Sequence, residues 1–447
     1  MKILLFCIDG ASWNVINPLL EKGRLPYLAS LISNGTRGYL DNLGIAESPV
    51  IWTSIATGMP PSRHGIDNFT TWMFRRGKNK LVQSRFLDRL PVKAKRILTK
   101  MRLVERVSVR SSMRKCRSTW NLLSESGGTV GVVNWWVTYP AEKVNGFLIS
   151  DHANFFRLKL RRDLGAISLP EDTIKNLPGV AYPDDVLTDV FSYDELKDEV
   201  LLERVERFAN LTPSDKTRFP TISTFERGDP LSVLKFSILL DEFAKHSCFN
   251  VLSKMEKQPD FLSVYFSGVD GISHYFWKFI HPEDFSIIPD EEKKRFGRVL
   301  NEYYIYMDEM LGEFLGKIAE DTVIIVISDH GFESVKPEGS EGANTGTHTG
   351  APNGILVISG PNIRQNVTVD GKITDLVPTM LYLFGLPIGK DMEGTIIRDA
   401  IEESTLNGHI AEYIDSWEKE HKAVKMHEVS DAEAKFKERL KALGYID

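Results

Sequence analysis

Carboxylate and imidazole side chains follow several of the apolar runs in this sequence. Six residues of these two kinds do so: Asp9, Asp270, His274, Asp329, His330 and His348. Carboxylate oxygens and imidazole nitrogens are ligands that Zn²⁺ accepts in proteins. Taken singly, an Asp could cap a turn, a His could be an ordinary half-buried residue, and Asp270 with His274 could be a capping pair at the start of a helix. Their joint occurrence in this order predicts a metal site.

The stretch ESPVIWTSIATGMPPSRHGI, residues 47–66, is rich in hydroxyl groups and raises the question of a nucleophile. Pro49 suits the first position of a helix and Gly58 suits its end, so we expect a helix with Ser48 as its N-cap. Hydroxyl groups inside the helix can bond back to a carbonyl and need no other role. Ser48 is therefore either a cap, a nucleophile or both.

Apolar runs bounded by polar turns predict the elements that position these residues. The runs are 2–9, 129–136, 261–268, 322–329 and 354–360. They are typical of buried strands, and helical patterns lie between them, including two within 13–35 and a long one within 295–321. This alternation predicts an α/β fold with a doubly wound, mostly parallel sheet and inserted cap elements. Functional side chains gather beyond the carboxyl ends of such strands, where these acids and histidines stand.

Composition indicates a globular protein in a reducing compartment. The chain has 447 residues, 42% of them hydrophobic, and only three cysteines, Cys7, Cys116 and Cys248. Few, widely spaced cysteines argue against a disulfide framework, so we expect a cytoplasmic protein. No uncharged run approaches the roughly 20 residues of a transmembrane helix, and the apolar run at the N-terminus is too short for a signal peptide.

Positive charge is concentrated in residues 75–117, which hold sixteen Lys or Arg against two acids, whereas the whole chain has a net charge of −6. This stretch could be a solvated arm, or it could face a phosphate-bearing ligand, an acidic lipid surface or nucleic acid. We predict a catalytic core of residues 1–71, 118–150 and 251–400, with a basic insertion at 72–117 and a cap insertion at 151–250. Residues 401–447 are predicted to form a charged, helical tail, because Ser430 and Glu433 have capping-box spacing.

Five motifs together resemble the alkaline phosphatase superfamily, and within it the type I phosphodiesterase and nucleotide pyrophosphatase branch. The motifs are IDGAS at 8–12, SPVIWTSIATGMPPSRHGI at 48–66, VDGISH at 269–274, SDHG at 328–331, and the loop around His348 followed by GILVISGP. A sulfatase of the same fold is disfavoured, because Ser48 is followed directly by Pro49 and no Arg stands at the spacing that formylglycine formation needs.

The resemblance implies two divalent metal ions, most often zinc, with manganese as the alternative. By position, Asp9, Ser48, Asp329 and His330 would hold one metal. Asp270, His274 and His348 would hold the other. Ser48 would be the nucleophile, where many nucleotide pyrophosphatases have Thr, and Asn68 would bind the phosphoryl oxygens.

The activity that the resemblance implies is hydrolysis of phosphodiester or phosphoanhydride bonds in a small phosphate ester, through a covalent phosphoseryl intermediate. Two alternatives remain open. One is a phosphomonoesterase or phosphotransferase that uses the same residues. The other is a catalytically silent relative that binds anionic polymers or membrane surfaces through residues 75–117.

Overall fold

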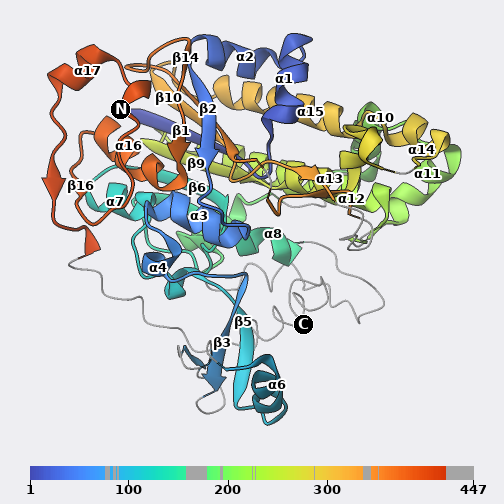
Figure 1. The fold of residues 1–447 in the computed structure, drawn as a ribbon, viewed down its shortest axis with the longest axis horizontal. Helices are drawn as coiled ribbons and strands as arrows, with labels where there is room; N and C mark the ends of the chain where they lie inside the picture. The colour runs from blue at the N-terminus through green and yellow to red at the C-terminus, as the bar shows by residue number, and fades with distance from the viewer. Residues whose placement is uncertain are drawn as a thin grey trace.

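A computed structural model of the chain is built around one large sheet (Figure 1). It describes residues 1–75, 81–83, 87, 90–157, 179–191, 195–223, 225–226, 228–285, 287–335, 344–350 and 352–418. Among these residues the main sheet has ten strands: β1 (Lys2–Ile8), β2 (Gly35–Asp41), β6 (Val130–Trp135), β7 (Gly146–Ser150), β8 (Ala181–Tyr182), β9 (Phe261–Phe266), β10 (Thr322–Ile327), β13 (Gly354–Ser359), β14 (Val367–Thr368) and β15 (Gly371–Lys372).

The centre of the sheet is parallel, as predicted. Strand β1 lies between β9 and β10, and β6 pairs with β9 and β7, all in parallel. Only β13, beside β10 and β2, and β8, beside β7, form antiparallel pairs in the described part of this sheet. All five predicted strands are present within one or two residues of their expected ends.

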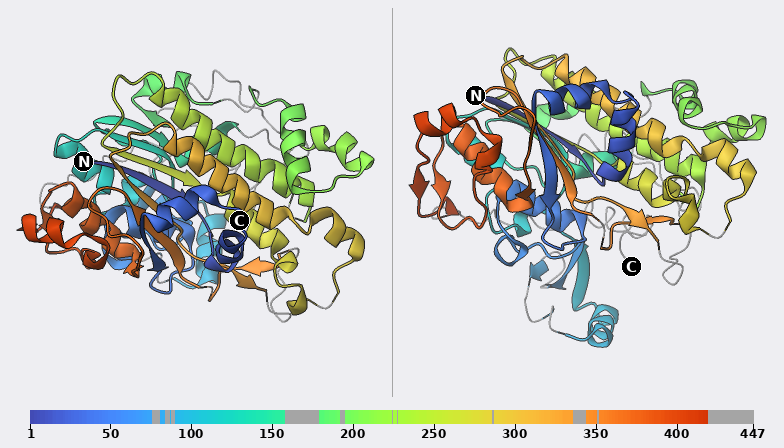
Figure 2. Two further views of the ribbon diagram at one scale, coloured as in Figure 1. Left: turned by 90° about the horizontal axis from the view of Figure 1, so that it is seen from above. Right: turned by 45° about the horizontal axis from the view of Figure 1, so that its top comes forward.

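Helices cover both faces, which is why the strands read as continuous apolar runs. One face packs against α1 (Trp13–Glu21), α2 (Pro26–Ser33), α12 (Pro230–Leu252), α13 (Gly268–Phe276) and α15 (Val299–Leu315). The other face packs against α3 (Ser48–Thr57), α7 (Thr119–Glu125) and α16 (Leu376–Leu383). Figure 2 shows the long helices α12 and α15 on the same face.

Strand β1 illustrates the two-sided burial. Leu4, Phe6 and Ile8 point into the first core, and Ile3, Leu5 and Cys7 point into the second. The period of two along a strand sends alternate side chains to opposite faces. No helix in the described ranges is both long and apolar enough to cross a bilayer.

The predicted basic insertion contains a second, smaller sheet. Antiparallel strands β3 (Thr70–Arg75), β4 (Leu81–Gln83) and β5 (Val104–Ser108) lie in the order β4-β3-β5, and α6 (Val92–Lys100) packs on β5. Figure 1 shows this unit projecting from the body, with α6 at its far end. We call residues 70–110 the arm.

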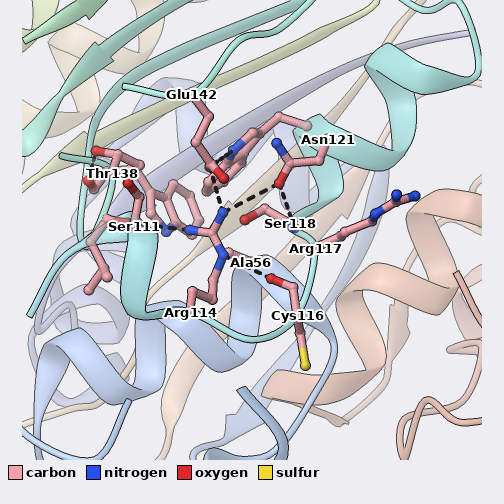
Figure 3. A network of polar contacts seen from close by, with 12 residues as sticks. Ala56, Ser111, Arg114, Cys116, Arg117, Ser118, Asn121, Thr138 and Glu142 are labelled. Atoms are coloured by element: carbon pink, nitrogen blue, oxygen red, sulfur yellow. Dashed lines mark hydrogen bonds and ion pairs between the residues drawn. The ribbon is translucent and has the colours of Figure 1, made fainter. Parts of the chain in front are cut away.

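The arm is fixed to the body at its root by a buried guanidinium (Figure 3). Arg114 forms an ion pair of 2.5 Å with Glu142, and its Nη2 also donates to Asn121 Oδ1. Its other nitrogens donate to the carbonyl oxygens of Cys116 and Val137. A buried, fully hydrogen-bonded Arg holds the chain in one geometry, because removing any partner would leave an uncompensated charge.

Parts of residues 151–250 contribute to the layers of the main sheet. Strand β8 extends the sheet beside β7, and α12 packs over β6 and β9. Helices α8 (Asp151–Arg157), α10 (Asp198–Phe208) and α11 (Pro213–Arg218) lie in the same region. The division of the chain into core and insertions stays a prediction.

The described part of the C-terminal region follows the core. It contains α17 (Glu403–Gly408) and β17 (Tyr413–Ile414), which pairs with β16 (Ile388–Gly389). The helix predicted at Ser430 and Glu433 lies outside the described residues. The remaining short elements include α4 (Pro61–His64), α14 (Asp290–Phe296), β11 (Glu333–Ser334) and β12 (Gly346–Thr347).

Candidate active site

A buried cluster of ligand-type atoms lies beyond the carboxyl ends of β1 and β10. It consists of Asp9, Asp329 and His330, whose ligand atoms all lie within 4.8 Å of one another. Nε2 of His330 is 3.4 Å from Asp9 Oδ1 and 3.4 Å from Asp329 Oδ2. The sequence predicted that these three residues meet, and they meet because parallel strands β1 and β10 are neighbours.

A second, half-buried cluster lies beside the first. It consists of Asp270 and His274 on α13 and of His348 in the loop after β12. Asp270 Oδ1 is 3.5 Å from His274 Nε2, since residues four apart share one face of a helix. The clusters adjoin each other: Asp270 Oδ1 is 4.0 Å from His330 Nε2, and the rings of His330 and His348 stack with centroids 4.1 Å apart.

The residues of both clusters fit divalent cations. Five of their buried atoms have no hydrogen-bond partner among the residues that the structure describes: Asp9 Oδ1, Asp270 Oδ1, Asp329 Oδ2, His330 Nε2 and His348 Nδ1. Buried polar atoms are normally hydrogen-bonded, and leaving one unpartnered costs about 1–3 kcal/mol. A group of such atoms, aimed at one another and of the type that metals accept, indicates that cations complete their coordination.

The electrostatics of both clusters, with Asp9 and Asp329 in the buried one and His348 in the half-buried one, point the same way. Burial raises the pKa of Asp9 well above its usual range, and the negative charges of Asp329 and Asp270 add to the effect. Burial also raises the pKa of Asp329 to about 7 and lowers the pKa of His348 to about 4. Adjacent carboxylates and a neutral imidazole in a dry site are stabilised by an added positive charge.

Outer partners orient the ligands of the buried cluster. The hydroxyl of Tyr265 donates to Asp9 Oδ2, which leaves Oδ1 free, and the N–H of Gly10 donates to Asp329 Oδ1 at 3.1 Å. Gly10 has φ of +71°, and a Cβ there would lie 2.6 Å from the Phe332 ring. Such partners fix the orientation of ligands in metal sites.

Backbone carbonyls orient the histidines. His274 Nδ1 lies 2.9 Å from Gly346 O, and His330 Nδ1 lies 3.1 Å from Gly331 O. Because a carbonyl oxygen only accepts, each Nδ1 carries the proton and each Nε2 keeps its lone pair. Nε2 is the nitrogen that faces the neighbouring carboxylates in both residues.

The helix that carries Asp270 and His274 is positioned by a buried acid that sequence reasoning missed. Asp241 on α12 accepts the N–H groups of Ser267 and Gly268, at 3.0 Å each, at the start of α13. Its second oxygen accepts the hydroxyl of Tyr303 at 2.8 Å. A carboxylate at a helix N-terminus satisfies free N–H groups and complements the helix dipole.

Tyr265 was also missed at the sequence level. It lies in β9, a buried strand, five residues before Asp270. A buried tyrosine usually finds a partner for its hydroxyl, so a Tyr in such a run was the available signal.

Ser48 lies at the start of α3, and its side of the helix is linked to the buried cluster. It is 7% exposed. One turn later, the Trp52 ring packs edge-on against Tyr265 with centroids 5.1 Å apart, and Tyr265 donates to Asp9. The prediction that Ser48 is the N-cap is wrong by one position: Glu47 is the cap, Ser48 is the first helical residue, and Pro49 is the second.

The rest of the predicted helix is confirmed. Gly58 ends α3 with φ of +66°, a left-handed conformation that suits glycine. The hydroxyls of Thr53, Ser54 and Thr57 donate to carbonyl oxygens four residues earlier. These three side chains have structural partners, and the role of Ser48 as nucleophile stays a prediction.

Asn68 lies in the exposed turn between α4 and β3. Its Oδ1 accepts the N–H of Phe69 at 2.7 Å. Phe69 packs edge-on against Trp136, whose Nε1 donates to the Tyr265 hydroxyl at 2.7 Å. Asn68 is thus connected to the site through neighbours, and its role in substrate binding stays a prediction.

Solved structures show the class of fold. The chain is similar to alkaline phosphatase PafA, with a TM-score of 0.50 and 12% identity over 90% of this chain and 99% of that one. It is also similar to murine ectonucleotide pyrophosphatase/phosphodiesterase 5, with a TM-score of 0.45 and 13% identity over 86% of this chain and 95% of that one. The first likeness confirms an alkaline phosphatase-like fold.

The family follows from the sequence. The family model "Type I phosphodiesterase / nucleotide pyrophosphatase" matches residues 3–443, and the chain belongs to this family of the alkaline phosphatase superfamily. The description of this family names two activities, phosphodiesterase and nucleotide pyrophosphatase, and its superfamily is metal-dependent.

Curated relatives match over a short stretch only. The 2,3-bisphosphoglycerate-independent phosphoglycerate mutase of Clostridium perfringens (strain SM101 / Type A) is 33% identical over 92 residues, which are 20% of this chain and 18% of the mutase. The corresponding mutase of Vibrio atlanticus (strain LGP32) is 31% identical over 94 residues. The chain thus matches less than a fifth of the length of these relatives.

Proposed function

We propose that the protein hydrolyses phosphodiester or phosphoanhydride bonds with two divalent metal ions, most often zinc, through a phosphoseryl intermediate on Ser48. The observation that supports this proposal is the pair of adjoining clusters, in which five buried atoms have no hydrogen-bond partner within the described part of the chain. A pair of metal sites suits an in-line displacement, in which an attacking and a leaving oxygen both carry negative charge.

Each residue would have a defined role. Asp9, Asp329, His330 and Ser48 would hold one ion, and Asp270, His274 and His348 would hold the other. The ions, when bound, would activate the nucleophile and neutralise charge on the phosphoryl group. The Ser48 hydroxyl would attack phosphorus, and the N-terminus of α3 would favour the negative phosphoryl oxygens beside it.

Water would complete the reaction by releasing phosphate or a phosphomonoester from Ser48. The half-buried cluster is the more accessible of the two, since the side chains of Asp270 and His274 are 25% and 26% exposed. The leaving group would therefore depart on that side. Asn68, which lies at an exposed turn, would hold a phosphoryl oxygen by hydrogen bonding.

The direct test measures hydrolysis of bis-p-nitrophenyl phosphate by protein stripped of metal and then reloaded with Zn²⁺ or Mn²⁺. We expect activity only after reloading. Attack by Ser48 would expel one p-nitrophenolate, so trapping the reaction with acid should give protein with one p-nitrophenyl phosphoryl group on Ser48. Metal-free activity or an absence of that adduct in a productive reaction would contradict the mechanism.

A phosphomonoesterase or phosphotransferase is the second candidate. The observation that favours it is the likeness to phosphoglycerate mutases over 92 residues. A comparison of p-nitrophenyl phosphate with bis-p-nitrophenyl phosphate separates the two activities. A clear preference for the monoester would reject the diester assignment while leaving Ser48 as the nucleophile.

The third candidate is a catalytically silent protein that binds anionic surfaces, and such a protein would not need to bind divalent metal. Metal analysis of carefully purified protein distinguishes it from an enzyme. Less than about one equivalent of divalent metal, with no gain on reloading, would favour a protein without catalysis.

A further inference from the structure

The outer side of α6 and the turn after it combine exposed aliphatic residues with cations. Ile97, Met101 and Leu103 are 59%, 61% and 43% exposed. Exposed cations lie among them. We call the following six residues the arm face: Lys93, Arg96, Ile97, Lys100, Met101 and Leu103.

The spacing of the arm face follows the helix. Lys93, Ile97 and Lys100 are separated by four and three residues, so they lie on one side of α6. The opposite side is occupied: Leu98 is half-buried where α6 packs on β5, and Lys95 Nζ lies 6.0 Å from the Trp72 ring centroid. The arm face therefore points away from the rest of the protein.

The cations of the arm face differ from three arginines elsewhere in the basic stretch 75–117. Arg75 pairs with Glu105, Arg114 with Glu142, and Arg117 with Glu125. In contrast, Lys93, Arg96 and Lys100 form no ion pair within the part of the chain that the structure describes. Among the described residues, these three cations of the arm face thus carry positive charge without an ion-pair partner.

We propose that the arm face docks the protein on a membrane surface that contains anionic phospholipids. Cations would attract the lipid phosphates, and Ile97, Met101 and Leu103 would enter the boundary between headgroups and acyl chains. A single short helix with a few apolar residues gives reversible attachment. This proposal does not rest on the proposed function.

Other occupants fit the arm face less well. Nucleic acid is bound by cations together with aromatic rings that stack on bases, and the exposed apolar residues of the arm face are aliphatic. A second copy of the chain would need a concave, acidic surface to accept a projecting helix, whereas lipids rearrange around one. The segment 419–447 has seven cations and six acids and so lacks the charge to complement the arm face.

Docking would hold the body in a defined position relative to the membrane. The root of the arm shares one hydrophobic cluster with α3 through Val50, two residues after Ser48. Its members are Val50, Ile66, Met73, Val107, Val109, Met113 and Val137. Anionic lipids are enriched in the cytoplasmic leaflet, which agrees with the cytoplasmic localisation predicted from cysteine usage.

The test measures co-sedimentation of the full chain with vesicles of phosphatidylcholine alone or mixed with phosphatidylserine. We expect binding to the mixed vesicles that weakens as salt is added. Replacing Lys93, Arg96 and Lys100 together by Ser should weaken binding by about a hundredfold, at about fivefold per cation. The double variant Ile97→Glu, Met101→Glu should weaken it by at least about tenfold.

Ile410→Glu is the matched control. Like the apolar residues of the arm face, Ile410 is exposed, at 84%, but it lies far from the arm in sequence, between α17 and β17. It should bind vesicles like the wild type, and all variants should keep their hydrolytic activity on a soluble ester. Equal binding to neutral vesicles, no binding to anionic ones, or equal loss in Ile410→Glu would overturn the proposal. Two other outcomes would also overturn the proposal: salt-sensitive dimerisation through the same cations, or oligonucleotide binding through them that Ile97→Glu does not change.

Discussion

The two ligand clusters of the site are built differently. Asp9, Asp329 and His330 are at most 3% exposed in their side chains, and they follow strands in the centre of the sheet. Asp270 and His274 are about a quarter exposed and lie on α13, a helix whose start is held by Asp241. One cluster is thus part of the core, and the other lies at its border.

This difference in burial predicts that the two clusters bind metal with different affinity and exchange ligands at different rates. The buried cluster has carboxylates that repel each other in a dry environment, so it should bind a cation tightly and keep it. The half-buried cluster is open to solvent and should exchange ligands and water more readily. The predictions below test this asymmetry.

The largest effect should come from Ser48, which lies on the side of the buried cluster. Ser48→Ala should lower turnover by about 10⁴-fold, because the nucleophile is lost, while both metals remain bound. Steady-state kinetics together with metal analysis measure the two quantities. Substantial residual turnover would move the nucleophile elsewhere.

The two clusters can be compared directly by removing one carboxylate from each. Loss of a residue that only orients a ligand lowers metal affinity by up to about 100-fold. Asp329→Asn removes a ligand itself, so it should weaken metal binding at the buried cluster by more than that. Asp270→Asn should weaken metal binding at the half-buried cluster and leave the other ion in place. Titration calorimetry of metal-free protein measures both affinities. Loss of both ions in Asp270→Asn would show that the clusters bind as one unit.

Asp329→Asn should weaken metal binding, but it should not destabilise the metal-free protein. Removing one of the crowded, buried carboxylates relieves repulsion, so metal-free Asp329→Asn should unfold at no lower a temperature than metal-free wild type. Calorimetry with and without metal makes the comparison. A large loss of stability in the metal-free variant would contradict the electrostatic account of the buried cluster.

A residue that hydrogen-bonds to a ligand of the buried cluster should affect metal affinity there more than a similar residue outside the ligand set does. Tyr265→Phe removes the hydroxyl that donates to Asp9 and should lower metal affinity there by about 10–100-fold. Tyr303→Phe is the matched control, since it removes another buried hydroxyl that donates to an aspartate, Asp241, outside the ligand set. Its effect on the buried ion should be small. Equal losses in the two variants would indicate a general packing effect.

The smallest effect concerns pH and a residue that belongs to neither cluster. Burial lowers the pKa of His64 to about 3 from an ordinary value of 6.5. The unfolded chain therefore binds more protons, so the stability from neutral His64 is complete above about pH 6.5 and is lost as pH falls toward 3. Between pH 7 and pH 5 the free energy of unfolding should drop by about 2 kcal/mol from this group.

Urea unfolding of metal-free protein at both pH values measures this loss. His64→Gln, which can still bond to Ser54, should reduce the drop by that amount. If the drop is unchanged in the variant, the acid sensitivity comes from other groups, including those of the clusters.

Much of the fold could be predicted because its signals are local. Each central strand is buried on both faces, so its apolar run is visible without knowing its neighbours. The helix at Ser48 has its own proline and glycine signals, and only its cap was misplaced by one residue, because proline is tolerated at the second helical position as well. Asp241 carried no such signal, because nothing in its own largely apolar helix shows that its carboxylate meets the start of α13.

The sequence by itself determined the strand ends, the ligand types and the family, because these are written in residue identity and spacing. Only the tertiary structure decided that β1 lies between β9 and β10, which brings residues more than 300 positions apart within reach of one ion. It also decided that Tyr265 and Asp241 support the two clusters, and that the cations of the arm face point outward. These properties depend on which strands and helices are neighbours, and packing of the whole chain sets that arrangement.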